Sequence, residues 1–212
     1  MCSPWMEVEP LSELPHAGRF PLLTPDVLTD AQRALYDAVA GPPRANGPFL
    51  VVDDEGHLAG PFNALLYSPN IGQAVQALGA ALRFGGSLSD RTRELVICAV
   101  AAELKSDYEW YAHSRVALSA GISPAELESV RAGQIPDAVG PDERAALSLA
   151  ISLLRDGVVS AEVHAEVLKY LGHPEVAELS VLVGYYQTLA GLLAAADVRA
   201  PLDPNPQITP HN

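Results

Sequence analysis

Residues 91–121 read RTRELVICAVAAELKSDYEWYAHSRVALSAG, and this stretch decides the fold. Leu95 to Ala102 is an uninterrupted run of eight apolar residues, too short to span a bilayer but suited to a helix buried in a core. Lys105 to Asp107 predicts a turn, after which the helical pattern resumes through His113. The stretch therefore predicts a buried helical hairpin, and we expect it to be the centre of an all-α protein.

The hairpin brings three ionisable side chains to one place. Glu109 and His113 are four residues apart and so share one helix face. If the two helices fold back about Lys105 and Ser106, Glu94 lies about one turn of 5.4 Å from His113, on its other side. A histidine held between two carboxylates, one of them partly desolvated, can exchange a proton with a carbon acid without a cofactor. We therefore interpret His113, Glu109 and Glu94 as candidate catalytic residues.

Each of the three residues also has a structural interpretation. Ser106 and Glu109 have the S-x-x-E spacing of a capping box, in which Glu109 would bond to the Ser106 amide and take no part in chemistry. Glu94 suits the first turn of a helix because its charge complements the helix dipole. His113 could be a core histidine with its hydrogen bonds satisfied. It is their convergence that favours the catalytic interpretation.

The same residues resemble a known family. Glu94, the Y-E-W-x-x-H motif of residues 108–113 and the Gly121-Ile122-Ser123-Pro124-Ala125-Glu126 continuation are similar to the carboxymuconolactone decarboxylase family, which shares the alkylhydroperoxidase D fold. The similarity also takes in residues 60–69 and Leu82-Arg83-Phe84, and extends from about Pro25 to Pro201. The resemblance implies an alkylhydroperoxidase D-like helical array. It also implies trimers or multiples of trimers, with the pocket close to a subunit interface.

The chain departs from the peroxidase branch of that fold. That branch carries a C-x-x-C pair, where this sequence has Ser106 and Glu109. Cys2 and Cys98 are the two cysteines of the chain, and they are far apart in sequence, so a resolving thiol is missing and C-x-x-C peroxidase chemistry is excluded. The resemblance that remains is to the decarboxylase branch, which needs no cofactor.

Composition limits the partners. The net charge of −13, with only 13 Lys and Arg residues, argues against nucleic acid. The hydrophobic content of 49% fills a core and leaves apolar surface, which together with the resemblance predicts a homo-oligomer. The chain has two cysteines and no signal-peptide pattern, which predicts a cytoplasmic protein. It has no apolar run of 18 residues, which predicts that it has no membrane span.

The chain order predicts three parts. Residues 1–28 contain five prolines and predict an extended arm, residues 29–200 a single helical domain, and residues 201–212 an extended or disordered tail. Within the domain we expect helices at residues 29–41, 62–67, 69–84, 123–131, 141–155, 161–171 and 174–196, besides the central pair. Residues 46–60 predict a hairpin or an acidic loop. His57 is interpreted as a surface-loop residue, and the acids beside it match no metal-binding template.

Further residues are candidates for binding the substrate. Arg83, Arg91 and Arg93 are the cations nearest to the proposed site in sequence, and one of them is expected to hold a substrate carboxylate. The resemblance places Asn63 near the pocket, although a helix-start asparagine can also serve as a cap. Phe62, Tyr108 and Trp110 are the expected aromatic contacts. Tyr185 and Tyr186 can reach a pocket with their hydroxyls or fill space in the core.

Three functions fit these residues. The first is a cofactor-free decarboxylase that acts on an unsaturated lactone or a β-keto-like carboxylic acid. The second is an isomerase, dehydratase or cyclase of secondary metabolism that uses the same residues without loss of carbon dioxide. The third is a non-catalytic, oligomeric binding protein. Together Glu94, Glu109 and His113 favour an enzyme.

Overall fold

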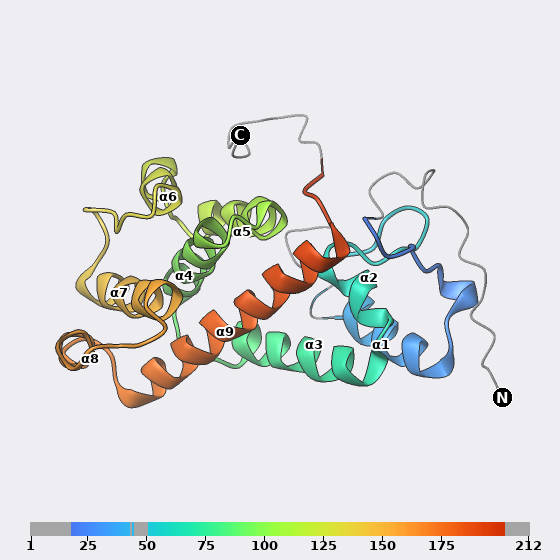
Figure 1. Ribbon diagram of the computed structural model, residues 1–212, viewed down its shortest axis with the longest axis horizontal. Helices are drawn as coiled ribbons and strands as arrows, with labels where there is room; N and C mark the ends of the chain where they lie inside the picture. Colours follow the sequence, from blue (N-terminus) through green and yellow to red (C-terminus); the bar gives the residue numbers. More distant parts are fainter. Residues whose placement is uncertain (1–17, 43, 45–50, 202–212) are drawn as a thin grey trace.

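The computed structural model describes residues 18–42, 44 and 51–201 of the chain (Figure 1). These residues form helices joined by short turns, and their one β-type contact is an isolated bridge between Val52 and Leu58. The predicted all-α class is therefore confirmed. The short 3-10 helix is Pro25–Val27, and the α-helices are α1 Asp30–Ala40, α2 Pro61–Leu66, α3 Pro69–Phe84, α4 Asp90–Glu103, α5 Asp107–Ser119, α6 Pro124–Arg131, α7 Pro141–Arg155, α8 Ala161–Val167 and α9 His173–Ala196.

Side-chain caps set several helix starts. Thr29 and Ser123 each form the predicted capping box, with Gln32 and Glu126 respectively. Ser89 accepts a hydrogen bond from the Thr92 amide and begins α4. Helix α8 ends four residues earlier than the expected Leu171, because the chain there tightens into turns of the 3-10 type.

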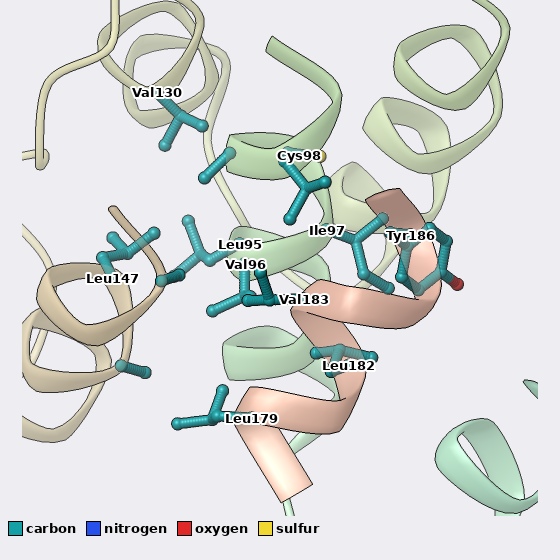
Figure 2. Packing of buried hydrophobic residues seen from close by; sticks show 14 of the residues in the cluster. Leu95, Val96, Ile97, Cys98, Val130, Leu147, Leu179, Leu182, Val183 and Tyr186 are labelled. Atoms are coloured by element: carbon teal, nitrogen blue, oxygen red, sulfur yellow. The ribbon is translucent and has the colours of Figure 1, made fainter. Parts of the chain in front are cut away.

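Helix α4 is the centre of the larger core. All ten residues from Thr92 to Ala101 are buried, because α5, α6, α7 and α9 surround the helix. Figure 2 shows Leu95, Val96 and Ile97 of α4 between side chains of α9 and α7, among them Leu182 and Leu147. A smaller cluster lies under α1 and α2. The hairpin predicted from residues 91–121 is thus the structural centre of the fold.

Helix α9 crosses the molecule between the group α4–α7 and the group α1–α3 (Figure 1). An 18-residue window within its 24 residues has a mean hydropathy of 1.5, so by length and composition alone the helix could span a membrane. Nine of its residues are buried against other helices, including Leu179, Leu182 and Leu189. A central core helix passes the same test of composition, and this is how α9 is used here.

The first described residues meet the end of α9. The Arg19 amide donates to the Ala196 carbonyl at 2.6 Å, and the Arg19 guanidinium donates to the Ala195 carbonyl at 3.1 Å. Gly18 takes φ +63°, and a Cβ there would lie 2.1 Å from the Ala196 carbonyl oxygen. The predicted arm is thus tied to the body over residues 18–28. Residues 1–17 of the arm and the predicted tail from 202 lie outside the described residues.

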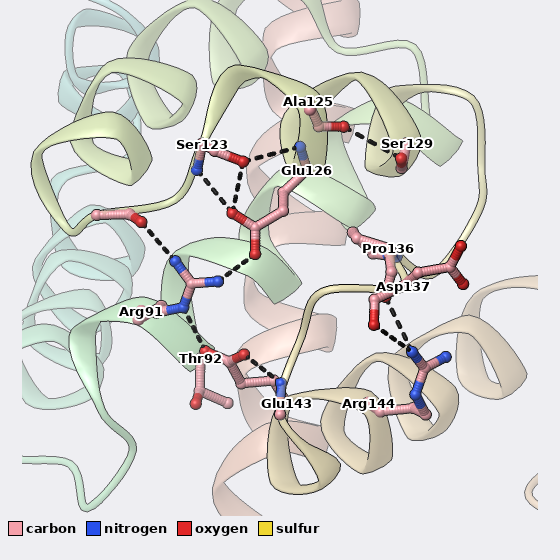
Figure 3. Close-up of polar contacts among 12 residues, drawn as sticks. Arg91, Thr92, Ser123, Ala125, Glu126, Ser129, Pro136, Asp137, Glu143 and Arg144 are labelled. Atoms are coloured by element: carbon pink, nitrogen blue, oxygen red, sulfur yellow. Dashed lines mark hydrogen bonds and ion pairs between the residues drawn. The ribbon is translucent and has the colours of Figure 1, made fainter.

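A polar network fixes the start of α4. Arg91 donates to the Gly121 carbonyl and to Glu143, each at 2.6 Å, and also pairs with Glu126 (Figure 3). Glu126 accepts the Ser123 amide and hydroxyl at 2.7 Å, and Glu143 accepts the Gly140 amide at 2.9 Å. Arg91 therefore joins α4 to α6 and α7, and is not available to a substrate.

Candidate active site

His113 lies where α5 passes α4. Its Nδ1 is 2.7 Å from Oε2 of Glu94, and both side chains are buried. An ionised carboxylate only accepts hydrogen bonds, so opposite an ionised Glu94 the proton of this contact lies on Nδ1, and Nε2 is the nitrogen on the side of Glu109. The turn between the two helices brings His113 of α5 to Glu94 of α4. In this turn Lys105 takes φ 52°, and the Ser106 amide donates to the Ala101 carbonyl at 2.9 Å.

Glu109 lies on the other side of the imidazole. Its Oε2 is 3.5 Å from Nε2 of His113, and only 4% of the residue is exposed. The capping interpretation of this residue is wrong, because Ser106 begins α5 without a side-chain hydrogen bond. Burial raises the pKa of Glu109, and the negative charge of Glu94 adds to this against the opposing effect of His113. The expected arrangement of one histidine between two acids is therefore present.

A cavity of about 50 Å³ opens beside these residues. It is bounded by α2, α3, α5 and α9, so four separate parts of the chain meet there. Among the predicted site residues it brings together Phe62, Arg83, Tyr108, Glu109 and His113. It also contains Arg44, Tyr185 and Tyr186.

Arg44 is a cation that sequence analysis missed. Its guanidinium lies 4.9 Å from the centroid of the Phe62 ring and donates to the Gln76 carbonyl at 3.3 Å. Burial lowers its pKa, and the nearby Arg83 contributes in the same direction. Arg44 follows Pro42 and Pro43 in a segment without helical periodicity, so no local pattern points to it. Two arginines therefore border the cavity that holds His113.

Two tyrosines of α9 complete the wall. The Tyr186 ring stands edge-on to the imidazole of His113, with centroids 5.0 Å apart, and the Tyr185 ring is 5.2 Å from that of Tyr186. Burial raises the pKa of Tyr185 to about 12, and it raises the pKa of Tyr186 well above its ordinary value. Both are thus neutral phenols at physiological pH and can donate hydrogen bonds to a carbonyl or enolate oxygen.

Asn63 does not line this cavity. Its amide group donates to the Pro21 carbonyl and accepts the Leu23 amide, both at 3.0 Å. It therefore fastens the N-terminal segment to α2, and it lines the neighbouring cavity of about 230 Å³ instead of the one that contains His113. Its alternative role as a cap is not found, because Gly60 is the N-cap of α2.

Arg93 and Trp110 are also outside the cavity. Arg93 donates to Asp90 at 2.6 Å, and its Nε is 3.8 Å from Oε1 of Glu94, behind the site. Trp110 is buried in the larger core, with the Arg131 guanidinium 5.3 Å from its ring centroid. Their predicted contacts with substrate are wrong. Residue spacing alone did not determine the rotation of each helix, and this rotation directs both side chains into the protein interior.

His57 differs from its predicted surface position. Only 7% of the residue is exposed, and its Nδ1 is 3.0 Å from Asp53 and 3.7 Å from Glu55. The Asp53 side chain also accepts the amides of Glu55 and His57, so the cluster closes the loop between Val52 and Leu58. Across residues 18–42, 44 and 51–201, no group of three or more His, Cys, Asp or Glu side chains is arranged to hold a metal ion.

Solved structures share this fold. A peroxidase-related protein from Ralstonia eutropha JMP134, described as an alkylhydroperoxidase AhpD core, superposes with a TM-score of 0.71 at 17% identity, covering 87% of this chain and 93% of that one. A peroxidase-related protein from Silicibacter sp. TM1040 gives 0.66 at 15% identity, covering 91% and 96%. The debrominase Bmp8 gives 0.64 at 15% identity, covering 85% and 90%. The protein therefore has the alkylhydroperoxidase D-like fold.

The core also matches a family model. Residues 69–152, from α3 to within α7, match the carboxymuconolactone decarboxylase family. This region, less than half of the chain, contains Glu94, Glu109 and His113. Curated proteins give no match to the sequence. The predicted resemblance is thus confirmed.

Proposed function

We propose that the protein is a cofactor-free carboxy-lyase that removes carbon dioxide from an unsaturated lactone acid or a β-keto-like acid. One observation carries the proposal: Glu94 holds Nδ1 of His113 at 2.7 Å, while Nε2 faces Glu109 and a cavity bordered by two arginines. This arrangement positions an acid–base group opposite a site for a carboxylate. The family match and the likeness to a debrominase support an enzyme in general.

The reaction follows from the lining of the cavity. Arg44 or Arg83 holds the substrate carboxylate, and the bond between that carboxylate and its carbon breaks to release carbon dioxide. The electron pair stays on the substrate as an enolate, whose oxygen takes a hydrogen bond from the neutral hydroxyl of Tyr185 or Tyr186. The His113 imidazolium then gives the Nε2 proton to carbon, and Glu109, whose pKa is raised, returns a proton to Nε2.

The test is a pair of histidine variants. His113→Gln is expected to lower the release of carbon dioxide from a panel of butenolide carboxylic acids and β-keto acids by about 10²–10⁴-fold, the usual contribution of a general acid or base. His164→Gln is the matched control, because His164 is exposed on α8, and we expect it to retain full activity. In deuterium oxide, the product should carry one deuterium at the carbon that lost the carboxylate.

Other results select another function. Turnover without carbon dioxide, together with solvent deuterium in the product, would assign the site to an isomerase, dehydratase or cyclase. Turnover that survives His113→Gln would contradict acid–base catalysis by this residue. Binding of the acids without any turnover would favour the non-catalytic alternative.

We also propose that the protein is a cytoplasmic homo-oligomer. Helix α3 exposes Ile71, Leu78 and Phe84, and α9 exposes Val181 beside open backbone at Gly184. Exposed apolar side chains on these two helices support subunit burial. Sedimentation should give a trimer or a multiple of it, and Leu78→Asp should reduce the assembled fraction while circular dichroism stays unchanged. A monomeric wild-type protein at micromolar concentration would contradict the assembly.

A further inference from the structure

Tyr108 separates two cavities. On one side is the cavity of about 50 Å³ that contains His113. On the other is a cavity of about 230 Å³ between the N-terminal segment, α2 and the end of α9, and Tyr108 lines both. The first residue of the Y-E-W-x-x-H motif thus stands between the candidate catalytic histidine and a larger space.

The smaller cavity is too small for the proposed reaction. Its volume of about 50 Å³ is far below that of a typical ligand site. Ligand sites usually measure roughly 300–1,000 Å³, and the two cavities joined approach the lower end of this range. Movement of the Tyr108 ring would join them.

The larger cavity suits an apolar group. Its walls are mostly Phe20, Leu22, Leu58, Ala59, Ala64 and Val198. The polar side chains that border it already have partners: Asn63 bonds to the N-terminal segment, Asp53 pairs with His57, and Arg199 lies 3.6 Å from Asp197. A hydrocarbon chain or ring would be buried there without breaking any of these polar contacts.

Packing holds the Tyr108 ring, and no hydrogen bond joins it to another residue that the structure describes. Gly60 takes φ +60°, and a Cβ at this position would lie 2.5 Å from the ring, so the ring rests directly on the glycine. Burial raises the pKa of Tyr108, and no hydrogen bond contributes to that shift. Rotation of the ring therefore costs packing contacts but no hydrogen bond.

We propose that the two cavities are one substrate site, and that Tyr108 is the gate between its polar and apolar compartments. The substrate is then a carboxylic acid with an apolar tail. Its carboxylate lies near Arg44 and Arg83, its reacting carbon near His113, and its tail beyond Tyr108. The assignment rests on the proposed function, because it takes the His113 cavity as the place of the reacting group.

Straight-chain carboxylates from butanoate to decanoate test the site by calorimetric titration. A buried methylene contributes about 0.8 kcal/mol, so affinity should rise by about fourfold per added carbon until the larger cavity is full. Ala59→Phe, which places a ring in that cavity, should abolish this rise and leave butanoate binding unchanged. Val198→Phe repeats the test from the opposite wall, and Ala125→Phe, on the exposed surface of α6, is the matched control.

Two more variants separate the compartments. Arg44→Gln should weaken binding of every chain length by the same factor, and Tyr108→Ala should speed association of the long acids. A flat series in the wild-type protein, or an unchanged series in both Phe variants, would overturn the proposal. So would an Arg44→Gln variant that binds every acid as the wild type does. The titration measures binding and needs no turnover. It would therefore still test the two-compartment site if the protein did not catalyse decarboxylation through His113.

Discussion

Helix α4 carries two charged groups one turn apart, and they are used in opposite ways. Arg91 meets Glu126, Glu143 and the Gly121 carbonyl, and every one of these contacts has hydrogen-bond geometry (Figure 3). Burial alone would raise the pKa of Glu126, but hydrogen bonds from Ser123 and Arg91 lower it overall. This cluster fixes its charges permanently and joins three helices.

The Glu94 cluster contains buried polar atoms without a hydrogen bond. Among the described residues, Oε1 of Glu94 and Nε of Arg93 are buried and form no hydrogen bond, only an ion pair with each other at 3.8 Å, and the pKa of Glu109 is raised. Buried groups of this kind are costly, and native proteins keep them chiefly where chemistry needs them. The difference teaches that satisfied charges mark the framework of this protein, and unsatisfied ones mark its candidate active site.

The largest effect should come from Glu94→Gln. An amide at this position no longer fixes the proton on Nδ1 of His113, and loss of the correct tautomer lowers turnover by about 10⁴-fold in the comparable catalytic triad. We expect a loss of 10³-fold or more in carbon dioxide release, with the fold retained by circular dichroism. Glu128→Gln, exposed on α6, is the matched control. Full activity in Glu94→Gln would contradict a catalytic role for the Glu94 cluster.

Arg91→Met should act on stability and leave chemistry unchanged. It leaves Glu126 and Glu143 without their common cation; breaking a buried pair costs about 3–5 kcal/mol, and the partial exposure of Arg91 reduces this to about 2–4 kcal/mol. Urea unfolding measures the change, and turnover per folded molecule should stay at the wild-type value. A variant that lost activity but kept its stability would contradict a framework role.

The smallest effect should come from Glu109→Gln, and it depends on pH. The pKa of Glu109 is raised above its ordinary value of 4.5 in the folded protein, so on raising the pH the unfolded chain ionises first and folding loses stability. The variant lacks this loss. The Tm of Glu109→Gln minus the Tm of the wild-type protein should therefore increase as pH rises from 4 to 8. The variant should also have a lower turnover than the wild-type protein. A difference in Tm that is constant with pH would contradict the raised pKa.

Much of the fold could be predicted because it is local. The apolar run of α4, the turn at Lys105 and the caps at Thr29, Ser89 and Ser123 determine helices and their ends within a few residues. The contact of His113 with Glu94 and Glu109 follows from the same local geometry, since one turn and one i, i+4 pair produce it.

The rest of the site depends on packing between distant elements. Arg44, Tyr185 and Tyr186 reach the cavity because α9 crosses α2 and α3, an arrangement without a signature in any one segment. Arg93 and Trp110 are next to site residues in sequence but lie outside the cavity, because small helix rotations decide which side chain meets it. The predicted split into arm, single domain and tail, like the catalytic roles, stays a prediction.

Cys98 has a practical consequence. It lies one turn after Glu94, is fully buried in α4, and burial together with the charge of Glu94 raises its pKa well above the ordinary value. A protonated, enclosed thiol reacts with alkylating reagents only when the core opens. Iodoacetamide labelling at this position, followed by mass spectrometry, would therefore time the opening of the innermost helix without adding any foreign probe.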